Sequence, residues 1–99
     1  MNTLIAVSIA PLGTGESVSR EVAEVVRVIE ESGLPSRTTA MYTEIEGEWD
    51  EVMAVLKDCV DAVAPYGARI SITMKADIRD AKSEQLDAKV ERVHSLLDE

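Results

Sequence analysis

The amino-acid sequence predicts an α+β fold in which an antiparallel sheet carries helices on one face. Three observations support this class. Segments with apolar residues at period two, or in short continuous runs, alternate with segments whose apolar residues have helical spacing. Glycine and proline separate most of these segments. The 99 residues suffice for one compact domain over residues 1–99, with a core of modest size.

Residues 3–10 are expected to form the first strand. They contain the run LIAVSIA, which is almost continuously apolar and suits a central strand buried at least in part on both faces. Pro11 is expected to end this strand. A loop over residues 12–16 follows, where Gly13 and Gly15 are free to take unusual backbone angles.

The first helix is expected to start at one of two candidate N-caps, Ser17 or Ser19. Gly33 ends the helix, and Pro35 supports that end two residues later. The apolar stripe of this helix consists of Val18, Val22, Val25, Val26 and Ile29.

Residues 36–40 and 43–47 are expected to form the second and third strands. No Asn-Gly or Asp-Gly pair marks the turn between them, so the sequence leaves their register open. Alternation divides the third strand and its exit into two faces. One face carries Thr43, Ile45 and Gly47, and the other carries Glu44, Glu46 and Glu48. These carboxylates either bind a cation or face water.

A second helix is expected over residues 49–64, with Cys59 inside its apolar stripe as a small core residue. The fourth strand, over residues 68–76, has the clearest period-two pattern of the chain. Its polar face consists of Arg69, Ser71, Thr73 and Lys75. After a polar connection over residues 77–82, a third helix is expected from residue 83, with an apolar seam formed by Leu86, Val90, Val93 and Leu97.

The order β-α-β-β-α-β-α is that of a ferredoxin-like fold with an additional C-terminal helix. We therefore expect four antiparallel strands with two helices on one face. The other face either stays a polar surface or becomes a wet subunit interface. We expect the third helix to bury its apolar seam against its own domain or against a neighbouring subunit.

Composition excludes several classes of function. The net charge of −9 argues against a nucleic-acid partner, although it permits a cationic ligand. One cysteine and one histidine make a disulfide framework or a Cys/His metal site implausible, and we expect no metal and no cofactor. No apolar run approaches the length of a membrane span, and no signal-peptide pattern is visible, so we expect a cytoplasmic protein.

The residues alone predict no catalytic set. The sequence Gly13-Thr14-Gly15 before a helix fits a plain turn better than an anion site, because it lacks the lysine and the spacing of a phosphate loop. Arg69, Lys75 and Arg79 either form cross-strand pairs with the glutamates of the third strand or contribute to a polar ligand pocket.

Several segments in combination resemble the thiamine-binding-protein-like family of small proteins. They are SIAPLGT at 8–14, ESGL at 31–34, TEIEGE at 43–48 leading into DEVM at 50–53, and GARI at 67–70 continuing to Lys75, Arg79 and Lys82. The resemblance covers almost the whole chain. It implies a ferredoxin-like fold, dimers or tetramers formed through sheet faces and helices, and binding of thiamine or its hydroxymethylpyrimidine moiety without a reaction.

The resemblance also implies which residues contribute to a ligand pocket. They are Ser8, Pro11, Leu12, Gly13, Thr14, Thr43, Ile45, Glu46, Gly47, Arg69, Ser71, Lys75 and Arg79. A carboxylate such as Glu44 or Glu46 would offset a cationic thiazolium ring. A flat ring would normally stack on aromatic residues, but only Tyr42, Trp49 and Tyr66 are available, and Trp49 fits better as a packing anchor.

Three functional hypotheses follow. The favoured one is a non-catalytic, homo-oligomeric binder of thiamine or its pyrimidine moiety. The second is a structural or regulatory interaction module without a thiamine ligand. The third, with least support, is an enzyme that uses Glu46 together with Arg69 or Lys75.

Overall fold

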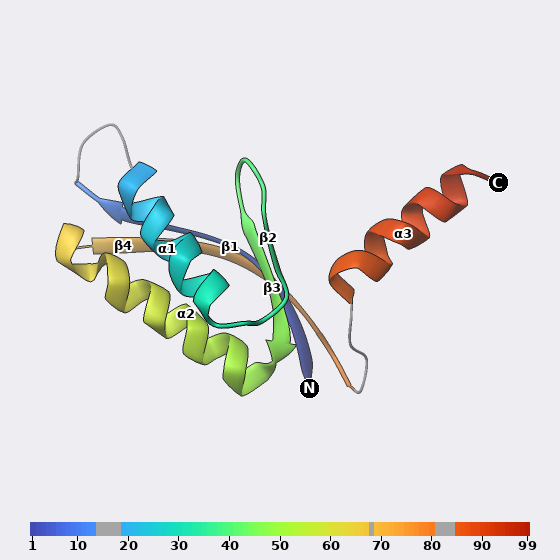
Figure 1. The fold of residues 1–99 in the computed structure, drawn as a ribbon, viewed down its shortest axis with the longest axis horizontal. Helices are drawn as coiled ribbons and strands as arrows, with labels where there is room; N and C mark the ends of the chain where they lie inside the picture. Colours follow the sequence, from blue (N-terminus) through green and yellow to red (C-terminus); the bar gives the residue numbers. More distant parts are fainter. Residues whose placement is uncertain (14–18, 68, 81–84) are drawn as a thin grey trace.

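The computed structural model describes residues 1–13, 19–67, 69–80 and 85–99. Thr14 and the candidate helix starts at residues 17 and 83 lie outside these ranges. In chain order the elements are β1 (Asn2–Leu12), α1 (Ser19–Glu31), β2 (Ser36–Thr38), β3 (Thr43–Glu48), α2 (Trp49–Val63), the short 3₁₀ helix η1 (Ala64–Tyr66), β4 (Arg69–Arg79) and α3 (Gln85–Leu97). Figure 1 shows their arrangement.

The described strands form an antiparallel four-stranded sheet in the order β2-β3-β1-β4. Helices α1 and α2 pack against each other and cover one face of this sheet (Figure 1). This is the predicted ferredoxin-like α+β fold with a C-terminal helix. The open register of the second and third strands is Ser36 opposite Ile45 and Thr38 opposite Thr43.

The core lies between the sheet and the two helices. Alternate residues of β1 contribute side chains to this core, because a strand directs successive side chains to opposite faces. Cys59 is fully buried there, as predicted for a small core residue. The buried apolar cluster consists of Ile5, Val7, Ile9, Val25, Ile29, Ile45, Val52, Val55, Cys59 and Val63.

Three predicted strand boundaries are wrong. Pro11 does not end β1, which continues to Leu12. Among the described strands, β4 alone pairs with β1 beyond Val7, so Pro11 removes no hydrogen bond on the side of β3. Residues 77–79 belong to β4, because they pair with the start of β1. Strand β2 ends at Thr38, where the turn toward β3 begins, since the backbone N–H of Thr39 donates to the carbonyl of Tyr42 over 2.8 Å.

Helix α3 extends away from the sheet at one end of the long axis of the molecule (Figure 1). Within the described structure only Leu86 of its predicted apolar seam is buried. Val90, Val93 and Leu97 remain 45%, 55% and 75% exposed. Burial of the whole seam against its own domain is therefore wrong, because the polar contacts of this helix with the strands come from its first turns, at Gln85, Leu86, Asp87 and Lys89.

Candidate functional site

Strand register places many of the predicted site residues on the sheet face opposite α1 and α2. Across β1, Leu4 lies between Glu46 and Asp77, and Ala6 lies between Glu44 and Lys75. Further along, Ser8 is opposite Thr73, Ala10 is opposite Ser71, and Leu12 is opposite Arg69. Arg79 follows at the other end, opposite Asn2. This face therefore presents acidic, small and basic residues in successive rows.

The structure does not bring all of these residues together. Eight residues along β1 separate Leu4 from Leu12, which corresponds to about 26 Å at the rise of a strand. Arg69, which pairs with Leu12, is therefore far from Glu46, which pairs with Leu4. Ser71 and Gly13 also lie toward the Arg69 end of the sheet.

Other predicted residues face the core or a turn. The side chains of Thr43, Ile45 and Pro11 are buried on the helix-covered side of the sheet. Gly13 has a positive φ of 83°, as in a tight turn. On the open face itself, Leu12 is 43% exposed and Ser8 is half-buried.

Glu46 is the buried carboxylate of the open sheet face, with 3% of its surface exposed. It accepts a hydrogen bond from the side-chain amide of Asn2 over 2.8 Å. It also accepts from the backbone N–H groups of Gln85, over 2.6 Å, and Leu86, over 3.2 Å. These two N–H groups belong to the first turn of α3, where backbone donors lack partners within the helix. Glu46 thus joins β3 to the start of α3.

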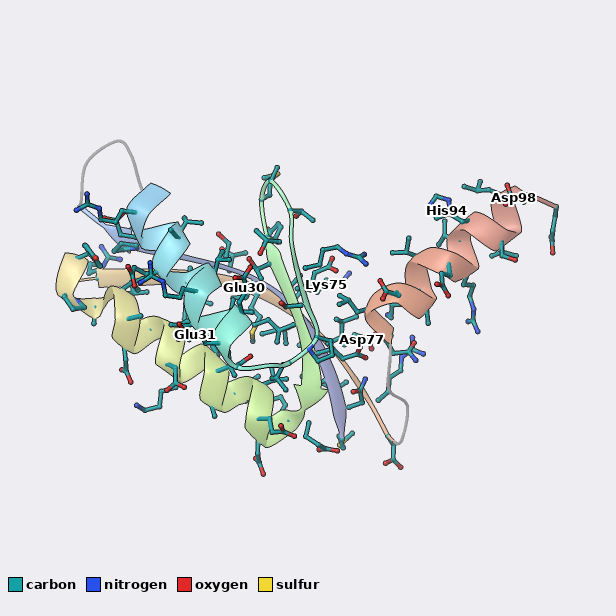
Figure 2. The ribbon with its side chains drawn as sticks, viewed as in Figure 1. Glu30, Glu31, Lys75, Asp77, His94 and Asp98 are labelled. Atoms are coloured by element: carbon teal, nitrogen blue, oxygen red, sulfur yellow. The ribbon has the colours of Figure 1, made fainter. Side chains whose placement is uncertain are left out.

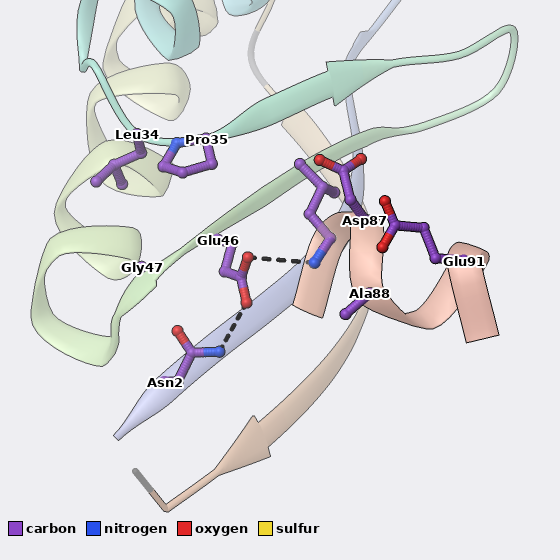
Figure 3. A pocket seen from close by; sticks show the side chains of 9 residues that line it. Asn2, Leu34, Pro35, Glu46, Gly47, Asp87, Ala88 and Glu91 are labelled. Atoms are coloured by element: carbon purple, nitrogen blue, oxygen red, sulfur yellow. Dashed lines mark hydrogen bonds between the residues drawn. The ribbon is translucent and has the colours of Figure 1, made fainter. Parts of the chain in front are cut away.

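A cavity of about 590 Å³ opens beside this carboxylate (Figure 3). It is bounded by β1, β3, the segment before β2 and the first two turns of α3. Its lining consists of Asn2, Leu34, Pro35, Glu46, Gly47, Leu86, Asp87, Ala88 and Glu91. Gly47 leaves little space for a side chain on its core side, since a Cβ there would lie 3.2 Å from Leu34 Cδ2 and that side chain would have to shift by a few tenths of an ångström.

The described lining is acidic. Asp87 and Glu91, one helical turn apart on α3, lie at the cavity together with Glu46 (Figure 3). Asp87 forms an ion pair with Arg37 of β2. Glu91 has no ion-pair partner among the described residues. Leu34, Pro35 and Leu86 supply the apolar surface of the cavity.

A smaller cavity of about 120 Å³ lies between α3 and the rows of Leu4 and Ala6. Glu44, Lys75, Asp77 and Lys89 supply its polar lining, and Figure 2 labels Lys75 and Asp77. A hydrogen bond from Lys89, with smaller contributions from its charge and from Arg79, lowers the pKa of Asp77 below its ordinary value. Arg79 lies 3.5 Å from the same carboxylate.

Sequence reasoning missed the contribution of α3 to the larger cavity. Asn2, Leu34, Pro35, Leu86, Asp87, Ala88 and Glu91 were not among the predicted site residues, whereas Glu46 and Gly47 were. The four-residue spacing of Asp87 and Glu91 does place both on one helix face. No pattern in the sequence shows that this face turns toward β3.

Aromatic residues do not line the larger cavity in the described structure. Trp49, at the first position of α2, is 43% exposed and borders a separate hollow of about 570 Å³ with Met1, Glu48, Asp50 and Ile78. His94 is exposed on α3 (Figure 2). The described residues contain no cluster of metal-binding side chains. None of the described helices has the length and hydropathy needed to cross a bilayer.

The chain is similar to a described protein family and to several proteins of other organisms. Residues 5–94 match the family model described as thiamine-binding protein. The UPF0045 protein Mb1933 of Mycobacterium bovis is 45% identical over 98 residues, covering 98% of this chain and 96% of the relative. The UPF0045 protein sll0230 of Synechocystis is 39% identical over 99 residues, covering 99% and 82% of the two chains.

Two crystal structures are similar over nearly their whole length. The hypothetical protein MJ1052 of Methanocaldococcus jannaschii has a TM-score of 0.85 at 31% identity, covering 94% of this chain and 96% of the other. Protein TM0486 of Thermotoga maritima, whose name proposes a role in thiamine biosynthesis or salvage, has a TM-score of 0.80 at 16% identity, with coverage of 94% and 99%. At that identity the second likeness concerns the fold alone.

Proposed function

This chain belongs to the thiamine-binding protein family, and from that premise we propose that it binds thiamine or its hydroxymethylpyrimidine moiety as a homo-oligomer, without catalysing a reaction. The observation that carries the proposal is the 590 Å³ cavity beside the buried carboxylate of Glu46. This volume lies within the range of about 300–1,000 Å³ that is common for small-molecule sites.

The lining matches the chemistry of the ligand. An aminopyrimidine offers hydrogen-bond donors and acceptors, which the carboxylates and the amide of Asn2 complement. A thiazolium ring carries a positive charge, which Asp87 and Glu91 offset at the cavity. Leu34, Pro35 and Leu86 contact the faces of the rings in place of aromatic residues.

Two observations support a binding role rather than catalysis. The carboxylate of Glu46 already accepts three hydrogen bonds from described residues, which supports a positioning role. Its proposed catalytic partners also lie elsewhere, because Lys75 lines the smaller cavity and Arg69 lies at the far end of the sheet.

A second copy of the chain is the proposed cover for α3. The exposed apolar residues on this helix are Val90, Val93, Leu96 and Leu97. Burial of such side chains is favourable by about 1.5–3 kcal/mol each, so a dimer or tetramer would gain from covering them. We further propose a cytoplasmic protein without a nucleic-acid partner, which the net charge of −9 supports.

The same exposed helix favours a second candidate function, a structural or regulatory interaction module without a thiamine ligand. In that case α3 would serve assembly, and the cavity would bind neither thiamine nor its pyrimidine moiety.

Isothermal titration with thiamine and with hydroxymethylpyrimidine tests the proposal, with the mass in solution measured by light scattering. Ala88→Trp fills the cavity from the exposed side of α3, and Ala54→Trp on α2 is the matched control. Saturable heat that is lost in A88W and retained in A54W, with the same mass in all three proteins, supports binding in this cavity. Heat retained in A88W contradicts the site, and absence of heat in the unaltered protein favours the interaction module.

A further inference from the structure

We infer that the cavity beside Glu46 is selective for charge: it accepts unphosphorylated, cationic thiamine and discriminates against thiamine phosphate esters, with Glu91 and Asp87 as the selectivity residues. This inference rests on the proposed function and specifies its ligand.

The charges of the lining carry the inference. Among the described residues that border the cavity, Glu46, Asp87 and Glu91 are acidic, and no lysine or arginine is included. A phosphate group placed there would meet like charges at short range, whereas a thiazolium ring would meet opposite charges. A site built to hold phosphate would instead present arginine, lysine or free backbone N–H groups.

Within the described part of the chain, no cationic side chain pairs with Glu46. The described residues that donate to it are the Asn2 amide and two backbone N–H groups, all of which are neutral. The same bonds occupy the N–H groups of Gln85 and Leu86, so the start of α3 cannot offer them to a phosphate. Two N–H groups at this helix N-terminus, which would ordinarily attract an anion, are therefore already bonded to a protein carboxylate.

The other two carboxylates differ in their surroundings. Asp87 is partly compensated by its ion pair with Arg37. Glu91 has no such partner within the described part of the chain and contributes its full charge to the rim. We therefore expect Glu91 to have the larger effect on selectivity.

The structure of thiamine esters explains why the acidic lining would disfavour their phosphate. The phosphate of a thiamine ester is joined to the thiazolium ring through a two-carbon arm, so a ring held among the carboxylates brings its phosphate close to them. Two lysines of the described structure, Lys75 and Lys89, do not compensate for this. Lys75 and Lys89 line the separate smaller cavity, and Lys89 is paired with Asp77.

The test is isothermal titration of the full chain with thiamine, thiamine monophosphate and hydroxymethylpyrimidine. We expect the monophosphate to bind about tenfold or more weakly than thiamine, from the Coulomb energy of like charges a few ångströms apart. Glu91→Gln should weaken the binding of thiamine about three- to tenfold and strengthen the binding of the monophosphate. Asp87→Asn should have the same effects to a smaller extent. Neither variant should change the affinity for the neutral pyrimidine.

Asp58→Asn is the matched control, because it removes one exposed carboxylate from α2, on the other face of the sheet. It should leave the ratio of thiamine to monophosphate affinity unchanged. If the unaltered protein binds thiamine and its monophosphate with equal affinity, this inference alone is overturned. The same holds if E91Q and D58N change the ratio of thiamine affinity to monophosphate affinity equally. Absence of heat with both thiamine and the pyrimidine overturns the proposed function, and the inference with it.

Discussion

At the scale of single residues, Glu46 has two consequences for the molecule. Its carboxylate lines the cavity and also accepts hydrogen bonds from the first backbone N–H groups of α3. A carboxylate at a helix N-terminus is favourable because the helix dipole is positive there. Loss of this side chain would therefore change binding and the position of α3 together, so a Glu46 variant alone cannot separate a binding protein from an interaction module.

We predict that Glu46→Ala lowers the free energy of unfolding by about 1.5–3 kcal/mol, because it leaves buried N–H groups without their acceptor. Urea denaturation measures this loss, and hydrogen exchange at the Leu86 amide reports on the helix start. Glu44→Ala is the control, since Glu44 lies on the same strand and face but is less buried. Equal stability of the two variants would show that Glu46 does not hold α3.

Cys59 provides a pH prediction. Its burial raises the pKa of the thiol from 9.0 to about 11. Because the folded pKa is above the unfolded one, the neutral thiol favours the folded state, and its contribution to stability is complete below pH 9. This contribution should decrease as the pH rises from 9 toward 11.

Denaturation of the unaltered protein and of Cys59→Ala across this pH range measures the effect, and the difference between the two removes the titration of other groups. Between pH 9 and pH 11, the free energy of unfolding of the unaltered protein should fall by about 2–3 kcal/mol more than that of the variant. Parallel curves would mean that the thiol does not titrate between folded and unfolded states in this way.

At the scale of elements, α3 is the part whose position depends most on polar contacts. Its first turns are held by Glu46, by the Arg37–Asp87 pair and by the Lys89–Asp77 pair. Its later turns expose apolar residues, including Val93 and Leu97. These later turns do not bury more surface within the described chain, because the helix extends away from the sheet (Figure 1).

We predict that Val93→Asp leaves the fold of the chain intact, with a change in unfolding free energy of about 0.5 kcal/mol or less, while it reduces the mass of the oligomer. Circular dichroism measures the first effect and light scattering the second. Ser95→Asp adds the same charge to the opposite side of the helix and should not change the mass. If V93D keeps the full oligomeric mass, α3 is not the subunit contact.

At the scale of the whole molecule, the chain has a net charge of −9, and its larger cavity is lined by acidic residues. Opposite charge raises the local concentration of a cationic ligand, and salt screens that attraction. Thiamine carries a positive charge and its pyrimidine moiety does not, so the two ligands should differ in their response to salt.

We predict that thiamine binding weakens by about threefold to tenfold when the salt concentration rises from 20 to 500 mM, while binding of the neutral pyrimidine changes little. Titration of both ligands at several salt concentrations measures this difference. The same salt dependence for both would indicate that charge plays no part in recognition.

The sequence by itself determined the order of the elements, the faces of the strands and the apolar helix stripes that form the core. These features follow from local periodicity, because neighbouring side chains along a strand or helix have fixed directions. Glu44 and Glu46 were therefore placed correctly on one face of β3, opposite Thr43 and Ile45, and Cys59 in the core.

Only the tertiary structure decided where strands end and what surrounds Glu46. Pro11 remains in β1 because β3 no longer pairs with the strand there, and residues 77–79 extend β4 because the start of β1 lies beside them. The contact between Glu46 and the N–H groups of Gln85 and Leu86 joins residues about forty positions apart. Long-range pairings of this kind depend on the packing of the whole chain, and local periodicity contains no information about them.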